Sequence, residues 1–229
     1  MRNRGDGTSD GTSGAGSPGA TRRGRHVTAP PVESEIRDDD WAGLDISGQT
    51  HERVAFIGID LIDVVNTGGS FTECTFRDCR LNASTHTATA FVNCTFVGCA
   101  FFDATFTDCK LVGTSFDRCT FGLFKIVGGD WSFVALAGAD LRRTSITGTR
   151  MREADLTGAR LQESTLHHVD LAGAWLHGVD LSGADLRGSD VSSVDPVATS
   201  MRGAIIDVEQ AMVLAEAFGL SVRDGVPRP

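Results

Sequence analysis

The stretch VDLSGADLRG, residues 179–188, contains the same five-residue unit twice: a small residue, aspartate, leucine, a polar residue and glycine. Asp180 and Asp185 therefore lie five residues apart, each directly before a leucine. An α-helix repeats near 3.6 residues and a strand every 2 residues, so a period of five fits neither. The repeat requires a different backbone path.

The five-residue period runs through most of the chain. In steps of five from Phe56 to Met201, thirty positions follow without a phase slip, and 27 of them hold a large apolar residue. At the positions two residues earlier, 28 of 30 hold Ala, Cys, Ser, Thr, Val or Gly, with Ile59 and Phe124 as exceptions. Each unit therefore turns one large and one small side chain inward.

Four such units close a square coil of about 20 residues, and successive coils stack through parallel backbone hydrogen bonds about 4.8 Å apart. The sequence thus predicts an all-β protein, a right-handed quadrilateral parallel β-helix. Thirty units give a rod about 36 Å long at that spacing. Glycine two residues after the large position suits turns with unusual φ and ψ. We assign a tail to 1–40, the β-helix to 41–206 and a helix to 207–222.

The tail and the overall charge restrict the class of protein. Residues 1–40 are rich in Gly, Ser, Thr, Pro and Arg, so they lack the apolar surface that offsets chain entropy, and we expect disorder there. The net charge of −9 disfavours direct binding to nucleic acid. No apolar run is long enough to span a membrane and no secretory signal is visible, so we expect a cytoplasmic protein without a membrane partner.

The cysteines and histidines are expected to be structural. All six cysteines occupy the small inward position: Cys74, Cys79, Cys94, Cys99, Cys109 and Cys119. Zinc sites usually need a C-x-x-C pair, which the chain lacks, so we interpret the thiols as small core residues. His86 falls at a large inward position, while His167 and His168 should point outward or into a turn. We expect no catalytic residues, no metal, no cofactor and no enzyme activity.

The run FGLFKIVGGDWSF, residues 121–133, is irregular. Phe124 is too large for its small inward position, and Trp131 is the largest residue at any large inward position. This combination predicts a local distortion or a bend in the rod.

The C-terminus changes from β-repeat to helix. Asp207 with Gln210 forms a helix-capping pattern, and Gly219 is a natural stop. One helical face holds Val208, Ala211, Met212, Ala215 and Phe218 and should cover the last coil. Apolar residues elsewhere on the helix indicate a partner, so we predict a homodimer through the last coils and the helix. Its interface residues would be Val208, Met212, Val213, Leu214, Ala217 and Phe218. Capping alone, without dimerisation, is the alternative.

Outward-facing aspartates directly before the large position are concentrated in the late coils: Asp140, Asp155, Asp170, Asp180, Asp185, Asp190 and Asp195. Duplex DNA carries about one negative charge per 1.7 Å, so a thin acidic rod can offer a similar field to a DNA-binding protein. Alternatively, these carboxylates solubilise the surface and accept hydrogen bonds from turn amides.

The units ADLTG and ARLQE (154–163), with VDLSG and ADLRG (179–188), resemble the A(D/N)LXX pattern of the pentapeptide-repeat family. The resemblance extends over about residues 41–222. THERVAF (50–56), AFVNCTF (90–96) and VDPVATSMRGAIIDVEQAMVLAEAFGL (194–220) are further similar to the MfpA-like fluoroquinolone-resistance proteins of mycobacteria. No insertion breaks the period, which differs from the loop-bearing Qnr proteins of Gram-negative bacteria.

The resemblance implies a function. MfpA-like proteins bind DNA gyrase as DNA mimics, inhibit supercoiling and protect against fluoroquinolones, and they contain a kink in the rod. On this basis the seven late aspartates are expected to contact gyrase, with the contacted subunit left open. Two alternatives remain: a structural or scaffold β-helix that binds another protein through a side face, with outward Trp175 as a contact, or a self-resistance factor against a gyrase-directed antibiotic.

Overall fold

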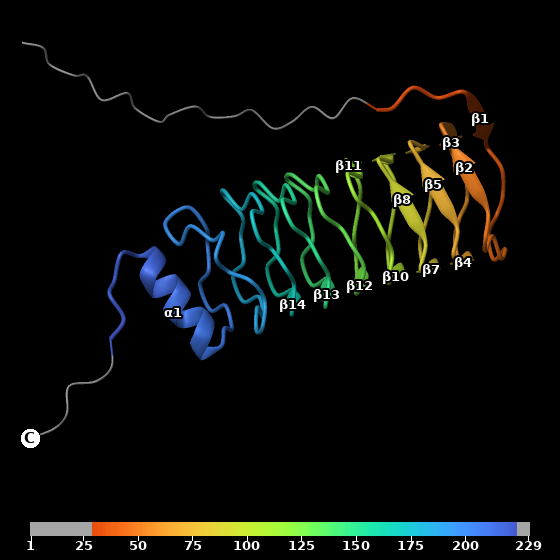
Figure 1. Ribbon diagram of the computed structural model, residues 1–229. Coiled ribbons are helices and arrows are strands. Elements are labelled where there is room, and N and C mark those ends of the chain that lie inside the picture. Colours follow the sequence, from red (N-terminus) through yellow and green to blue (C-terminus); the bar gives the residue numbers. More distant parts are fainter. Residues whose placement is uncertain (1–28, 224–229) are drawn as a thin grey trace, which may run out of the picture.

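The computed structural model describes residues 29–223. They form a rod of stacked four-sided coils, with a single helix at one end and β1 (Ser34–Arg37) at the other (Figure 1). The predicted parallel β-helix with a C-terminal helix is therefore confirmed. Residues 1–28 of the predicted tail lie outside the described residues. The tail boundary at residue 40 is too late, because β1 pairs in register with β3 (Val54–Ile57) and Ile36 packs against the core.

The four sides of the coil are named in chain order by one inward residue each: side 1 by Phe96, side 2 by Phe101, side 3 by Phe106 and side 4 by Leu111. Strand partners are twenty residues apart, so that Phe76 lies beside Phe96 and Phe96 beside Phe116. Every side therefore repeats once per coil, as the five-residue period requires.

All strand pairs are parallel. Side 1 has the order β1-β3-β6-β9-β11, with β6 (Thr75–Arg77), β9 (Thr95–Val97) and β11 (Ser115–Asp117). Side 3 has the order β14-β13-β12-β10-β7-β4, with β4 (Val65–Thr67), β7 (Thr85–Thr87), β10 (Thr105–Thr107), β12 (Lys125–Val127), β13 (Ser145–Thr147) and β14 (Thr165–His167). Side 4 contains β2 (Thr50–Glu52), β5 (Ser70–Thr72) and β8 (Ala90–Val92). Side 2 is joined by isolated bridges.

The turns between sides use left-handed backbone. At the glycines two residues after the large position, φ lies between 62° and 74°, as predicted: Gly138, Gly148, Gly158, Gly173, Gly178, Gly183 and Gly188. Asp78 (φ 54°) and Arg143 (φ 59°) adopt the same conformation at equivalent positions. Most residues avoid this region, so the stacking of neighbouring coils holds them there.

The core changes character along the rod. Phe56, Phe76, Phe96 and Phe116 stack face to face at ring-centroid distances of 4.7, 4.6 and 5.0 Å. This column ends at Phe116, and the last aromatic residue of the core is Trp131 on side 4, which is fully buried; the large inward positions that follow are mostly leucine. Five cysteines are buried and Cys119 is half-buried, so the prediction that they pack inward holds. Their thiols donate to backbone carbonyls.

Polar residues interrupt the core on side 3. His86 is 1% exposed, and its Nε2 lies 3.1 Å from Ser84 Oγ while its Nδ1 lies 3.4 Å from Asn66 Nδ2. Because Ser84 Oγ donates to the carbonyl of Leu81, His86 donates from Nε2 and accepts at Nδ1. Burial lowers the pKa of His86 to about 3, so the imidazole is neutral, as a hydrogen-bonded core histidine requires.

The backbone ladder is broken on side 2, next to the irregular run 121–133. Bridges join Ala100 to Thr120 and Asp140 to Arg160, but within residues 29–223 none joins Thr120 to Asp140. The other three sides stay connected at this level: Phe116 N donates to Ala135 O, Trp131 N to Arg150 O, and β12 pairs with β13. Coils joined on three sides and parted on the fourth are locally distorted, so the predicted local distortion is confirmed.

Phe124 explains the position of the break. Its ring is 1% exposed at the corner between sides 2 and 3, where the other coils from residue 64 to residue 204 hold Ala, Ser, Thr or Val. It packs against Phe101, Phe106 and Phe121 at centroid distances of 5.7, 5.4 and 5.4 Å. Close-packed interiors respond to added volume by shifting the backbone, so this corner keeps the next coil away from side 2.

The C-terminal helix α1 (Val208–Ala217) begins as predicted. Asp207 is the N-cap, and Asp207 and Gln210 form both hydrogen bonds of a capping box. Gly219 follows the C-cap with φ 78°. The predicted covering face was wrong, because Gln210 and Leu214 are the buried helix residues while Val208 is 77% exposed.

Candidate partner-binding surface

The seven late aspartates lie on all four sides of the rod. Their positions in the bridges place Asp155 and Asp195 on side 1, Asp140 and Asp180 on side 2, Asp185 on side 3, and Asp170 and Asp190 on side 4. On side 2, Arg160 separates the two acids. The structure therefore forms a band of acid around the late coils and does not bring these residues into one stripe.

Each of the seven carboxylates supports its own turn. Each accepts a hydrogen bond from the backbone N–H two residues later, over distances from 2.8 to 3.4 Å. This is the turn-stabilising role considered from sequence. The turn amide uses Oδ1 in every case, so Oδ2 is left for other contacts.

Three of the seven aspartates are paired with cations. Asp140 lies 2.7 Å from Arg142 and 2.8 Å from Arg160, and the hydrogen bond from Arg142 is the main cause of its lowered pKa. Asp170 Oδ2 accepts from Arg152 at 2.6 Å.

Asp185 is held by Arg187 and lies 3.0 Å from His167 Nε2, and these contacts, Arg187 first, lower its pKa. His167 is half-exposed and His168 exposed, as expected for outward residues.

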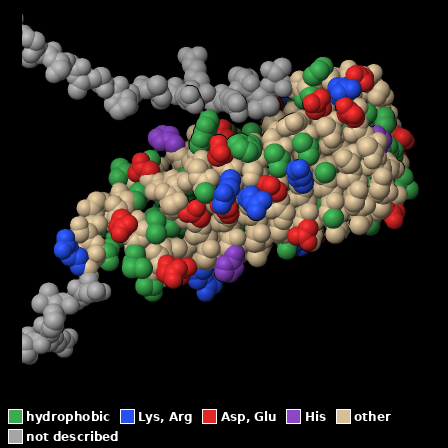
Figure 2. All heavy atoms as spheres, in the orientation of Figure 1, with side chains coloured by type: hydrophobic (Ala, Val, Ile, Leu, Met, Phe, Trp, Pro, Cys, Tyr) green, Lys and Arg blue, Asp and Glu red, His purple; other side chains and the backbone are tan. Residues whose placement is uncertain are grey.

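Asp155, Asp180, Asp190 and Asp195 form no ion pair in the described part of the chain. Hydrogen bonds from Ser182 lower the pKa of Asp180, which stays ionised at neutral pH. The partnering arginines were missed from sequence, although the spacing carried a signal: Arg142 and Arg187 follow their aspartates by two residues. Figure 2 shows red and blue side chains interspersed over the coils next to the helix.

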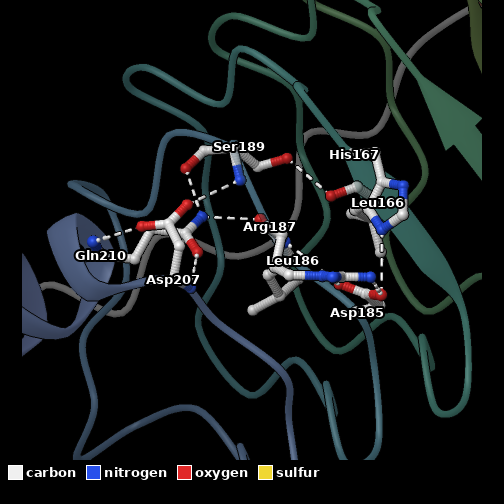
Figure 3. A network of polar contacts seen from close by, with 9 residues as sticks. Leu166, His167, Asp185, Leu186, Arg187, Ser189, Asp207 and Gln210 are labelled. Atoms are coloured by element: carbon white, nitrogen blue, oxygen red, sulfur yellow. Dashed lines mark hydrogen bonds and ion pairs between the residues drawn. The ribbon is translucent and has the colours of Figure 1, made fainter.

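A network of polar contacts fixes α1 to the last coils (Figure 3). Gln210 Nε2 donates to the carbonyls of Leu186 (2.6 Å) and Ser189 (2.7 Å), and Asp207 Oδ2 accepts from Gly188 N (2.9 Å). These bonds set the rotation of the helix about its axis and turn Leu214 inward. Leu214 is 8% exposed, so its assignment to a dimer interface was wrong.

The rest of the predicted interface is exposed. Val208, Met212, Val213, Ala217 and Phe218 all face outward from the coil, and Leu220 extends this apolar surface. On side 1, Trp175 is 43% exposed and Val197 is also exposed.

Two kinds of feature were not found in the described part of the chain. In residues 29–223 no three His, Cys, Asp or Glu side chains are grouped as metal ligands. In the same residues no helix is both long and apolar enough to span a membrane. A cleft lies at the side 2 break.

Two family models match the sequence. The model of pentapeptide repeats matches residues 135–171 and 164–195, and a model described as the SV2A/B/C luminal domain matches residues 40–121. The first match identifies residues 135–195 as pentapeptide repeats, and the same five-residue period continues without a break from Phe56. No curated protein matches it closely.

Solved structures of pentapeptide-repeat proteins share the fold. HetL from the cyanobacterium Nostoc, involved in heterocyst differentiation regulation, has a TM-score of 0.61 at 21% identity, over 75% of this chain and 82% of HetL. QnrB1, a plasmid-mediated fluoroquinolone resistance protein, has a TM-score of 0.51 at 16% identity, over 84% of this chain and 99% of QnrB1. At these identities the similarity concerns the fold.

Proposed function

We propose that the protein binds DNA gyrase as a mimic of duplex DNA, inhibits supercoiling and protects gyrase from fluoroquinolones. The observation that carries the proposal is the acidic band on a thin, regular rod. QnrB1, a resistance protein with the same fold, and the sequence resemblance to MfpA-like proteins agree with it. The action proposed is binding, without catalysis.

The physical basis is electrostatic. A surface that binds DNA is positively charged, and carboxylates at regular spacing around a rod attract it as phosphates do. Asp155, Asp180, Asp190 and Asp195 carry most of this proposed contact, because they form no ion pair in the described residues. Binding should weaken as salt rises, since exposed charges are screened over about 8 Å at physiological ionic strength.

The proposed assembly is a homodimer through α1. The exposed apolar residues Val208, Met212 and Phe218 lie at one end of the rod, where a second copy would cover them. Two rods joined at this end would span about 70 Å at 4.8 Å per coil.

Light scattering at micromolar concentration tests the dimer. Phe218→Glu should give a monomer, while Phe133→Glu, at an exposed position away from the helix, should leave the dimer intact. A monomeric parent protein contradicts the assembly.

A supercoiling assay with the host gyrase tests the function. We expect inhibition by the parent protein, and loss of inhibition after Asp155, Asp180, Asp190 and Asp195 are changed together to Asn. A control with Asp45, Asp63, Asp78 and Asp108 changed to Asn removes the same charge from exposed positions in the early coils. An equal loss of inhibition in both variants would show that only the net charge matters. If the parent protein does not inhibit supercoiling, the proposal is wrong.

The exposed side 1 surface favours one second candidate, a scaffold that binds another protein through Trp175 and Val197. Trp175→Ser separates the two functions, since it should weaken the binding of that partner and leave the inhibition of supercoiling unchanged. Self-resistance in a strain that makes a gyrase-directed antibiotic shares the first mechanism and differs in genetic context.

A further inference from the structure

The break on side 2 leaves two complementary backbone edges facing each other. In a regular coil four hydrogen bonds would cross here: Arg118 N to Ala137 O, Phe121 N to Asp140 O, Leu123 N to Arg142 O, and Asp140 N to Cys119 O. None of the four is present among the described residues, while the equivalent bonds form in the coils before and after, such as Phe101 N to Thr120 O and Leu141 N to Arg160 O. Unpaired strand edges are templates for another strand.

The opening between the edges is a cleft of about 830 Å³, within the range of pockets that hold ligands. Phe121, Cys119 and Leu123 supply apolar lining. The exposed ring of Phe102 packs over Gly122 at the rim, where a Cβ on Gly122 would lie 2.8 Å from it. The cleft therefore offers both backbone groups and apolar surface along one extended segment.

The charge at this cleft is opposite to that of the protein. Four arginines line it, Arg118, Arg142, Arg143 and Arg160, against Asp140 and Glu163. The whole chain has 30 acidic and 21 basic residues.

The arginines already form ion pairs: Arg118 with Asp117, Arg142 and Arg160 with Asp140, and Arg143 with Glu163. Their side chains are at least half exposed, and exposed pairs contribute little, so an added carboxylate can share or replace them.

We propose that the side 2 cleft binds an extended peptide segment with carboxylate side chains, which adds as a strand between the two open edges. Main-chain hydrogen bonds provide the affinity, and the arginines select acidic side chains. A basic or neutral segment lacks partners for the guanidinium groups.

The reaction rate of the Cys119 thiol reports whether the cleft is occupied. It is the one half-exposed cysteine in the described residues, and it lies in the cleft. The probe is a blocked peptide, acetyl-Thr-Glu-Leu-Glu-Thr-amide, and the control is the same peptide with lysine in place of glutamate. The glutamate peptide should slow the reaction of Cys119 with a thiol reagent in the full-length protein, and the lysine peptide should not.

Two matched variants test the contacts. Arg143→Gln should weaken the binding of the glutamate peptide about tenfold, because one charge-assisted hydrogen bond is lost. Arg150→Gln, on side 4 and outside the cleft, should leave its binding unchanged. Equal protection by both peptides, no protection by either, or the same protection by inorganic phosphate alone would overturn the proposal. Circular dichroism of each variant checks that the rod is folded.

Discussion

The two halves of the rod are built from the same repeat but stabilised differently. In residues 34–133, the aromatic half, phenylalanine rings stack along the axis at 4.6 to 5.0 Å between centroids. In residues 134–206, the leucine half, the large inward positions are mainly leucine and the small positions often alanine. Twelve of the fourteen strands lie in the aromatic half, and isolated bridges predominate in the leucine half.

The difference follows from the coil spacing. Parallel coils repeat about every 4.8 Å, which is also a good distance for stacked rings, so phenylalanine fits the aromatic half without changing the backbone. The leucine half gains less from its core and instead presents aspartates on every side. The two packings meet at Phe124 and Trp131, where the side 2 ladder breaks. One repeat thus carries two core packings, and the side 2 ladder is interrupted where they meet.

The largest expected effect is in the aromatic core. Phe96→Ala should cost about 3–5 kcal/mol of unfolding free energy, because the ring is fully buried between Phe76 and Phe116. Leu161→Ala, equally buried in the leucine half, should cost about 2–4 kcal/mol because it leaves a smaller cavity. Urea unfolding followed by circular dichroism measures both. A larger loss for Leu161→Ala would contradict the comparison.

The regular part of the fold could be predicted from sequence because one spacing controls it. The step of five fixes which side chains point inward, and the pair Asp207 and Gln210 fixes where the helix starts. Phe124 indicated the distortion on side 2, since its side chain is too large for a small inward position. These features depend on residues close in sequence or on the repeat itself.

The remaining features depend on contacts between distant residues. The helix turns Leu214 inward because Gln210 reaches the carbonyls of Leu186 and Ser189, and no periodicity in the helix shows this. The acid band is partly neutralised by arginines such as Arg160, one coil away from Asp140. Ile36 joins the first coil although its neighbours are polar, because β3 offers it an edge.

The second prediction concerns the open end of the leucine half. Gln210→Ala should cost about 2–3 kcal/mol, since it removes two buried hydrogen bonds and leaves the carbonyl of Ser189 without this donor, while the carbonyl of Leu186 still accepts from Ser189 N. Glu216→Ala, on the exposed surface of the same helix, should change the stability by less than about 0.5 kcal/mol. Chemical unfolding measures the difference. If Gln210→Ala leaves the free energy of unfolding unchanged, the hydrogen bonds of the helix contribute little to stabilising the end of the leucine half.

The third prediction is a pH dependence located in the aromatic half. Burial lowers the pKa of His86 from 6.5 to about 3 in the folded state. Between these values the unfolded chain binds a proton that the folded chain does not, so stability falls as the pH falls below 6.5. The expected loss between pH 7 and pH 5 is on the order of 2 kcal/mol.

His86→Phe should reduce this pH dependence, and His177→Gln, at an exposed position, should not. Partial burial also lowers the pKa of His51, which leaves a smaller dependence of the same sign in the variant. Unfolding free energies at pH 7, 6 and 5 give the test. If the pH dependence of the unfolding free energy is unchanged in His86→Phe, the loss of stability at low pH arises from other groups.

The smallest expected effect concerns the charges of the leucine half. Asp140→Asn keeps an acceptor for the turn amide and removes the charge shared by Arg142 and Arg160, so stability should change by less than about 1 kcal/mol. Asp180→Asn, which has no cation partner in the described residues, should change it by even less. Urea unfolding could instead give a loss of unfolding free energy as large as that of Gln210→Ala. These carboxylates would then stabilise the fold itself. That result would contradict the contrast between an aromatic half specialised for stability and a leucine half specialised for binding. A small loss, together with weaker inhibition of gyrase by the variant with four late aspartates changed, assigns the acidic surface to a partner.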